Sequence, residues 1–135
     1  MPTFAEVIPR LPVRDLQRTI AFYTGCLSFA LDVVWPESNP TFAILRRDST
    51  NLGFFEPSEH QDGPIGYAEL YLHVTDSLAF YESVRGKAAV EWGPEVYSYG
   101  RREFAFRDPD GYLVIITEPT EEAPTTSEPG DGGAG

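Results

Sequence analysis

The sequence predicts an α+β fold in which a strand, a helix and three further strands occur twice, at about residues 5–57 and 66–118. Two observations carry this prediction: the pattern of the first half restarts after a polar linker, and the second half ends in a β-hairpin signature. The halves match at four pairs of positions: Val13, Asp15, Phe22 and Tyr23 in the first half, and Val74, Asp76, Phe80 and Tyr81 in the second. Such repetition indicates a fold built from duplicated units. We therefore expect one domain over residues 1–118 and a separate tail at 119–135.

In the first half, the apolar residues of 5–13 predict a strand. Pro9 and Pro12 predict an edge strand or a strand with an exposed side, because proline cannot donate a ladder hydrogen bond. Asp15 is the expected N-cap of a helix that ends at Gly25. Three more strands are predicted after this helix, at residues 28–35, 41–46 and 52–55.

The second half predicts a strand at 68–74 and a short helix that Asp76 caps and that ends near Arg85. A strand at 88–92, a loop at 93–100 and a closing hairpin with strands at 102–107 and 112–117 follow. The hairpin turn reads Asp108-Pro109-Asp110-Gly111. Pro109 presets φ near about −65°, and Gly111 tolerates positive φ, so the turn suits a hairpin.

Residues 119–135 are mostly Pro, Gly, Ser, Thr and acidic residues, so they have little apolar surface to bury. We expect them to form a disordered acidic tail. Four of the acidic residues lie in this tail, so −7 of the total charge of −11 remains on residues 1–118. An acidic body disfavours nucleic acid and anionic membranes as partners. The charge either keeps the protein soluble or lines a cleft for a cationic ligand.

The sequence gives no sign of export or membrane insertion. No apolar run reaches the roughly 18 residues that a membrane-spanning helix needs. The N-terminal residues lack the basic and apolar segments of a signal peptide. Cys26 is the only cysteine, so no intrachain disulfide can form. Its thiol is most simply buried and inert. The expected location is cytoplasmic.

Strand alternation assigns the side chains of residues 69–74 to two faces. Leu70, Leu72 and Val74 should pack under the helix, while the opposite face carries three polar or amphipathic side chains: Glu69, Tyr71 and His73. This second face is either a polar exterior or a wall that faces a ligand.

Four strings resemble the bleomycin-resistance proteins of the vicinal-oxygen-chelate superfamily, which also includes glyoxalase I, extradiol dioxygenases and fosfomycin-resistance enzymes. The strings are residues 8–15, 51–56, 72–81 and 102–111, and the resemblance covers about residues 5–118. It implies that the two repeats form a curved mixed sheet shaped as a cup. It also implies a homodimer in which an N-terminal strand is exchanged.

Enzymes of this superfamily hold a divalent metal at four strand positions, which the resemblance places at Ile8, Gly53, Glu69 and Ile115. Of these side chains, only that of Glu69 has a donor atom, whereas such metals need about three or four protein ligands. His73 lies four residues further along the strand, about 13 Å away, which is too far to share a metal with Glu69. We expect no metal and no other cofactor, although these four positions do not exclude a metal site elsewhere in the chain.

The leading hypothesis is a binding protein that sequesters a cationic aromatic compound, such as an antibiotic, in a dimer cleft. The candidate ligand-binding residues are Trp35, Phe42, Phe55, Tyr71 and Tyr99 as stacking walls, Glu69 and Glu103 as counter-charges, and His73 on the same face. Phe42 and Phe55 could equally belong to the core. The alternative hypothesis is a metal-dependent lyase or dioxygenase of the same superfamily with a rearranged site, and no catalytic residue is assigned.

Overall fold

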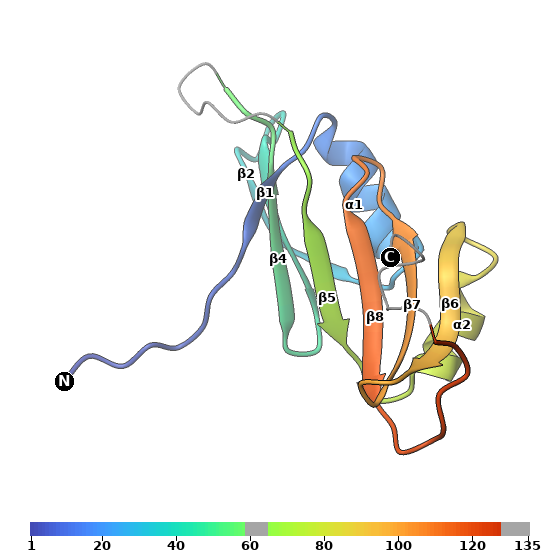
Figure 1. Ribbon diagram of the computed structural model, residues 1–135. Coiled ribbons are helices and arrows are strands. Elements are labelled where there is room, and N and C mark those ends of the chain that lie inside the picture. The colour runs from blue at the N-terminus through green and yellow to red at the C-terminus, as the bar shows by residue number, and fades with distance from the viewer. Residues whose placement is uncertain (59–64, 128–135) are drawn as a thin grey trace. The chain divides into compact units, whose positions relative to one another are not determined.

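The computed structural model describes residues 1–58 and 65–127 and divides the chain into two compact units, residues 1–66 and 67–135. Each unit contains one helix and one four-stranded sheet (Figure 1). The predicted α+β fold with two strand–helix–three-strand repeats is confirmed. Neither helix in the described ranges has the length and apolar character that crossing a bilayer would require.

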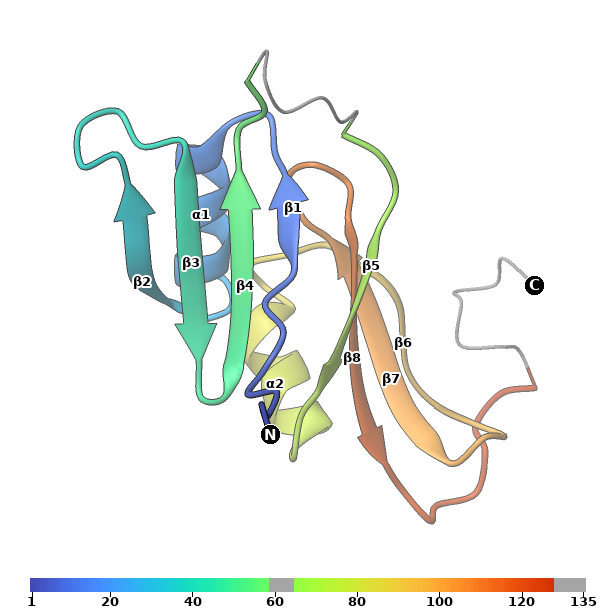
Figure 2. The ribbon, with the colours of Figure 1, turned by 90° about the vertical axis from the view of Figure 1, so that its left-hand side faces the viewer.

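The first unit has the sheet order β1-β4-β3-β2, in which β1 runs parallel to β4 and the other pairs are antiparallel. Its elements are β1 (Arg10–Pro12), α1 (Leu16–Gly25), β2 (Ala30–Trp35), β3 (Phe42–Arg47) and β4 (Thr50–Phe55). Figure 2 shows this sheet face-on, with α1 behind it. The helix packs through Tyr23, whose ring centroid lies 4.9 Å from that of Phe54 and 5.9 Å from that of Phe29.

The second unit repeats this arrangement with the sheet order β5-β8-β7-β6, in which β5 runs parallel to β8. Its elements are β5 (Glu69–His73), α2 (Ser77–Val84), β6 (Val90–Tyr97), β7 (Arg101–Arg107) and β8 (Leu113–Pro119). The helix packs through Phe80 and Tyr81, whose ring centroids lie 6.3 Å and 5.3 Å from that of Phe104. One face of each sheet is therefore covered by the helix of its own unit.

Both helices start in the same way. The predicted N-caps are confirmed: the Asp15 carboxylate accepts from the Arg18 amide at 3.1 Å, and the Asp76 carboxylate accepts from the Ala79 amide at 3.0 Å. In each unit a glutamate at the end of the last strand accepts from the first helical amide. These contacts are Glu56 Oε2 to Leu16 N at 2.8 Å, and Glu118 Oε1 to Ser77 N at 2.9 Å. The repeat thus extends to how each helix is anchored to its sheet.

The hairpin between β7 and β8 follows the predicted turn chemistry. Asp108 Oδ1 accepts from the amides of Asp110 at 2.9 Å and Tyr112 at 3.0 Å, and Gly111 has φ of +88°. Asp108 is buried, so its oxygen replaces water as the partner of both amides.

Strand β1 is shorter than the predicted strand at 5–13. Residues 1–9 precede it, and Figure 1 shows the N-terminal end of this segment trailing away from the sheet of its unit. Further along, the Glu6 carboxylate accepts from Asn51 Nδ2 of β4 at 3.3 Å. Pro9 and Pro12 lack N–H groups, so this strand contributes few donors to the ladder. The Pro9 carbonyl still accepts from Gly53 N at 2.8 Å, and Val13 N donates to the Phe55 carbonyl at 2.8 Å.

Strand β6 is longer than expected, because it continues to Tyr97 through part of the predicted loop at 93–100. Its pairing with β7 is irregular between Trp92 and Glu95, where Gly93 adopts φ of +81°. A Cβ atom at this glycine would lie 2.3 Å from the Glu103 carbonyl oxygen. Gly93 therefore allows β6 to change register close to β7, a long-range contact that its local sequence does not reveal.

The predicted disordered tail at 119–135 needs correction over its first part. Pro119 ends β8, and residues 120–125 hydrogen-bond to β6 and to the turn that follows it. Backbone amides and the side chains of Thr and Glu, rather than buried apolar surface, make these contacts. Residues 128–135 lie outside the described part of the chain.

Candidate functional site

The candidate site lies on the face of the second sheet that is opposite α2, which we call the open face of the second unit. The predicted alternation along β5 is confirmed: Glu69, Tyr71 and His73 are exposed, whereas Leu70 is buried. The strand register adds neighbours to this face, because Tyr71 pairs with Ile115 and His73 pairs with Thr117 on β8. Glu103 on β7 pairs with Thr117 in turn.

Glu103 is the centre of a cluster of hydroxyl groups. Its side chain is only 1% exposed, although a carboxylate is rarely buried without partners. Tyr99 donates its hydroxyl to Oε1 at 2.6 Å, Thr117 Oγ1 donates to Oε2 at 2.8 Å, and the Tyr71 hydroxyl also donates to Oε2. Three hydroxyl donors thus compensate the buried charge and fix the directions of two phenol rings.

Arg101 extends this network toward His73. Its Nε donates to Thr117 Oγ1 at 2.6 Å, and its terminal nitrogen lies 3.0 Å from His73 Nδ1. A guanidinium can only donate, so Nδ1 accepts, and in a neutral ring Nε2 then carries the hydrogen. The His73 ring also meets the Tyr71 ring edge-on, with centroids 5.3 Å apart.

The environment keeps both phenols of the cluster protonated. Burial and the hydrogen bond to Glu103 raise the pKa of Tyr71 above its ordinary value of 10.0. The same two causes raise the pKa of Tyr99 still further. Both residues are therefore neutral hydrogen-bond donors at physiological pH, and both are about half exposed.

An apolar area adjoins the polar cluster on the same face. Ala105, Leu113 and Ile115 form a buried cluster, and Trp92 packs against it. The Trp92 ring meets the Tyr97 ring edge-on, with centroids 6.0 Å apart. Tyr97 stacks on Tyr99 at 5.6 Å with an interplanar angle of 5°. A row of aromatic rings therefore leads from the apolar area to the Glu103 cluster.

Glu69 lies outside this cluster, because its exposed carboxylate accepts from the Tyr67 hydroxyl instead. Of the other three positions that the resemblance assigns to metal ligands, Ile115 belongs to the apolar area, and Ile8 and Gly53 lie in the first unit. Within residues 1–58 and 65–127, no three His, Cys, Asp or Glu residues come close enough to hold a metal together. These four residues offer a single donor side chain, so they do not fit a metal centre of the expected type.

The first unit carries its own aromatic face. Trp35 pairs with Phe42, and Phe42 pairs with Phe55, so the three rings form a stripe across β2, β3 and β4. The Arg10 guanidinium lies over this stripe, 4.4 Å from the Phe42 ring centroid and 5.6 Å from that of Phe55. Phe42 and Phe55 are half-buried, and Trp35 is 64% exposed.

The stripe lies on the face opposite α1. Phe54 packs against Tyr23 of the helix, and Phe55 points the other way because successive strand residues alternate. Phe42 and Phe55 therefore do not pack under α1, and both are half-buried on the opposite face. The structure thus groups the predicted residues by unit, with Trp35, Phe42 and Phe55 in the first and Glu69, Tyr71, His73, Tyr99 and Glu103 in the second.

Strand pairing also shows which positions of the two repeats correspond. Arg10 pairs with Gly53 in the first unit, as Tyr71 pairs with Ile115 in the second. The corresponding positions are Arg10 and Tyr71, Gly53 and Ile115, Phe55 and Thr117, and Phe42 and Glu103. The duplicated fold therefore presents a cation over aromatic rings in one unit and a buried carboxylate with phenols in the other.

Sequence patterns did not point to several residues of these faces, namely Arg10, Trp92, Tyr97, Arg101 and Thr117. Two-residue alternation along the last hairpin could have placed Arg101 beside Glu103, and the repeat could have assigned Arg10 to the position of Tyr71. Trp92 and Tyr97 had no such signal, because the irregular pairing of β6 interrupts the alternation.

Comparison with known families gives a match over most of the chain. The family model described as Glyoxalase/Bleomycin resistance protein/Dioxygenase superfamily matches residues 4–116. Comparison with curated proteins gives no match.

Several solved structures share the fold. TnmS3 from Streptomyces sp. CB03234, described as an antibiotic binding protein, is 22% identical with a TM-score of 0.72, over 89% of this chain and 100% of that one. TioX from Micromonospora sp. ML1 is 17% identical with a TM-score of 0.75, over 85% of this chain and 99% of that one. A superfamily member from Sphaerobacter thermophilus is 24% identical with a TM-score of 0.69, over 85% and 98% of the two chains.

Proposed function

Because the chain belongs to the Glyoxalase/Bleomycin resistance protein/Dioxygenase superfamily, we propose that it is a metal-free binding protein that sequesters a cationic aromatic small molecule, such as an antibiotic. The observation that carries this proposal is the Glu103 cluster, in which a buried carboxylate holds the Tyr71 and Tyr99 phenols in fixed directions beside an apolar area. Rigid aromatic rings next to oriented polar groups are typical of small-molecule sites.

The binding role is supported by what replaces the metal ligands. Ile8, Gly53 and Ile115 have no donor atoms where the enzymes of the superfamily carry His or Glu. Ile115 contributes instead to the apolar area that adjoins the phenols. The description of TnmS3 as an antibiotic binding protein supports the same role for this chain.

A cationic ligand fits the charges and rings of the candidate residues. In the second unit, the exposed Glu69 carboxylate supplies a counter-charge, and the exposed Tyr71 and Tyr99 rings attract a cation. In the first unit the exposed ring is that of Trp35, because the Arg10 guanidinium already lies over Phe42 and Phe55. Glu103 has a different role from the one we expected, because it is too buried to meet a ligand in this conformation. It orients the phenols, which are the groups that a ligand reaches.

We also propose that the protein is a homodimer in which the N-terminal arm, residues 1–8, binds the partner copy. Phe4 and Val7 of this arm are 101% and 86% exposed. Two large apolar side chains on an extended segment gain hydrophobic stabilisation when a second copy covers them.

Titration calorimetry with a metal-free bleomycin-type glycopeptide tests the binding role. We expect wild-type protein to bind it, and Tyr99→Phe to weaken binding by about 2- to 10-fold, the range for one lost hydrogen bond. The matched control is Tyr81→Phe, which removes a hydroxyl from the α2 side of the unit and should leave affinity unchanged. Absence of binding by the wild type, together with about one tightly held transition metal per chain, would overturn the proposal in favour of an enzyme.

A further inference from the structure

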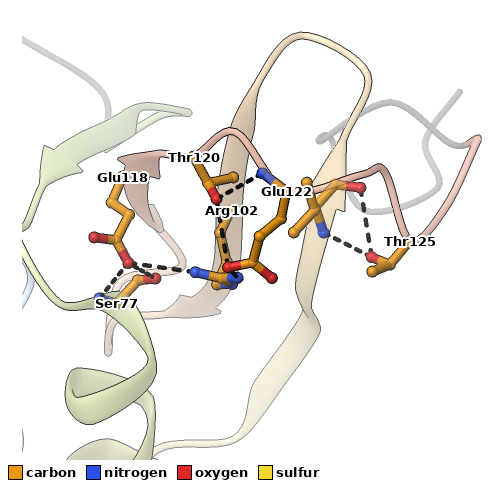
Figure 3. Close-up of polar contacts among 7 residues, drawn as sticks. Ser77, Arg102, Glu118, Thr120, Glu122 and Thr125 are labelled. Carbon is orange, nitrogen blue, oxygen red and sulfur yellow. Dashed lines mark hydrogen bonds and ion pairs between the residues drawn. The ribbon is translucent and has the colours of Figure 1, made fainter.

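The segment just after β8, residues 120–125, hydrogen-bonds to both ends of the stretch 96–100. Figure 3 shows this segment with Thr120, Glu122 and Thr125. At one end, Thr125 N donates to the Val96 carbonyl at 2.8 Å, and Val96 N donates to Thr125 Oγ1 at 2.7 Å. At the other end, Thr120 N donates to the Gly100 carbonyl at 3.0 Å. We call residues 120–125 the strap.

A side-chain contact reinforces the strap. Glu122 accepts a hydrogen bond from Arg102, whose side chain is only 12% exposed and also lies 3.7 Å from Glu118 Oε1. Glu118 in turn accepts from both the amide and the hydroxyl of Ser77 at the start of α2. The hydrogen bond and the charge of Arg102 lower the pKa of Glu122, so the contact is between charged groups at neutral pH. Through Arg102 and Glu118, the strap is thereby connected to β7, β8 and the start of α2.

The stretch between the two attachment points carries Tyr99. Gly100 N donates to the Tyr97 carbonyl at 3.0 Å and Gly100 has φ of +82°, which makes a tight turn next to Tyr99. The Tyr99 hydroxyl reaches Glu103 from this turn, and its ring stacks on Tyr97. Half of the Tyr99 side chain is exposed, so packing alone fixes it only in part.

We propose that the strap is a positioning element for the ligand site: Glu122 and Thr125 hold the turn after β6 so that the Tyr99 phenol stays on Glu103. This inference rests on the proposed function in one respect, namely that Tyr99 contacts the ligand. The strap itself does not touch the ligand. Its contribution is to order Tyr99 before binding, which reduces the conformational entropy that is lost when the ligand binds.

The first test compares two truncations of the full chain. One ends after Thr120 and removes most of the strap, and the control ends after Ser127 and keeps it. Each is also made with Tyr99→Phe, so that the difference in ultraviolet phenolate absorbance between a truncation and its Phe counterpart reports the ionisation that depends on Tyr99.

In the control truncation, Tyr99 should ionise at the same high pH as in the full chain, because burial, Glu103, Tyr71 and Tyr97 all raise its pKa. Loss of the strap should release the phenol and move its ionisation toward the ordinary value of 10.0. Over the pH range in which far-ultraviolet circular dichroism shows both truncations to be folded, the loss of a strap that only adds stability would lower the melting temperature and leave this titration unchanged. Identical Tyr99 titrations in the two truncations would overturn the inference.

Point variants cover the case in which the shorter truncation fails to fold. Glu122→Gln removes the charge that meets Arg102, and Glu121→Gln removes the same charge at the neighbouring exposed position. Thr125→Val removes the hydroxyl that accepts from Val96. Glu122→Gln and Thr125→Val should each shift the ionisation of Tyr99 to lower pH, and Glu121→Gln should not. An equal shift in both glutamine variants would show a general charge effect and would contradict the inference.

Binding of the bleomycin-type glycopeptide separates this inference from the proposed function. Loss of the strap should weaken binding by about 2- to 10-fold, the range for ordering one side chain. If wild-type protein does not bind the drug, the proposed function fails, while the Tyr99 titration still decides whether the strap positions the phenol. If the drug binds equally to both truncations, the strap has no role in the site.

Discussion

Glu103 illustrates how the surroundings of one residue decide its role. A buried carboxylate is costly unless hydrogen bonds compensate its charge, and here two phenols and a threonine hydroxyl do so. The same bonds convert two flexible tyrosines into fixed hydrogen-bond donors. The local sequence identified Glu103 as a candidate counter-charge, but one of the phenols that compensate its charge, Tyr71, lies 32 residues away in the chain, on β5.

Replacing Glu103 with Gln tests this role. The amide leaves at least one phenol without its acceptor, so we expect the variant to be about 1–3 kcal/mol less stable at neutral pH. Glu103 raises the pKa values of Tyr71 and Tyr99, so both should titrate at lower pH in the variant.

The sign of the pH dependence follows from these raised pKa values. A phenol whose pKa is raised by folding stabilises the native state fully below its unfolded pKa of about 10. This contribution is lost as the pH rises toward the folded value. Wild-type stability should therefore fall steeply above about pH 10, and Glu103→Gln should fall less steeply. Denaturant unfolding at several alkaline pH values measures both slopes, and parallel slopes would contradict this role for Glu103.

Gly93 is a second residue whose importance arises from distant contacts. An added Cβ would meet the Glu103 carbonyl oxygen at 2.3 Å, and φ of +81° is unfavourable for other residues. We expect Gly93→Ala to destabilise the protein by at least about 1–3 kcal/mol. Gly86→Ala is the control, because no atom lies within 4 Å of its Cβ position. Equal melting temperatures of the two variants would show that β6 relaxes around the new side chain.

At the scale of elements, local patterns were most informative where the structure itself is local. Asp15 and Asp76 were predicted as helix caps because a cap needs only its own side chain and amides three residues along. The turn at 108–111 was predictable for the same reason. The path of β6 and the contacts of residues 120–125 depend on strands distant in sequence, and sequence patterns misplaced both.

The hairpin turn offers a direct test at this scale. Asp108→Ala removes the oxygen that two buried or half-buried amides share, at 2.9 and 3.0 Å, and should cost about 1–3 kcal/mol of stability. Asp108→Asn retains a side-chain oxygen and should cost less. Thermal unfolding of both variants checks the order, and a larger loss for Asn than for Ala would contradict this role of the turn.

At the scale of the whole molecule, duplication explains both the regularity and the asymmetry of the candidate faces. Each unit uses the same strand order, and each starts its helix with an aspartate and a glutamate. The repeated pattern made the fold predictable from sequence. The corresponding positions carry different chemistry, with Arg10 matching Tyr71 and Phe42 matching Glu103, so fold similarity alone could not give the site.

The N-terminal arm permits a test of the proposed homodimer. Deleting residues 1–7 removes the exposed Phe4 and Val7 and keeps Pro9, whose carbonyl accepts from Gly53. We expect full-length protein to be a dimer at micromolar concentration and the deletion to shift it toward monomer. Light scattering measures both. The double variant Phe4→Ser and Val7→Ser keeps the chain length, and a monomeric full-length protein would contradict the proposal.

The last prediction concerns how much long-range charge attraction and contact with aromatic rings each contribute to the affinity for a cation. Long-range attraction by the net charge of −11 is screened by salt, since the Debye length falls from about 10 Å at 0.1 M to about 3 Å at 1 M. Contact between a cation and a ring, worth roughly 0.5–2 kcal/mol, acts at short range and is screened less. Affinity for a bleomycin-type glycopeptide should therefore weaken with salt without vanishing.

Two variants separate these contributions, because each removes one of them. Glu69→Gln removes an exposed carboxylate and should lower both the affinity and its dependence on salt. Trp35→Ala removes an exposed ring and should lower the affinity while the salt dependence stays nearly the same. Calorimetry of the wild type and both variants at low and high salt measures the affinity of each protein and its dependence on salt. If Trp35→Ala changes the salt dependence as much as Glu69→Gln does, charge and stacking are not separate contributions and the division between the two kinds of residue is wrong.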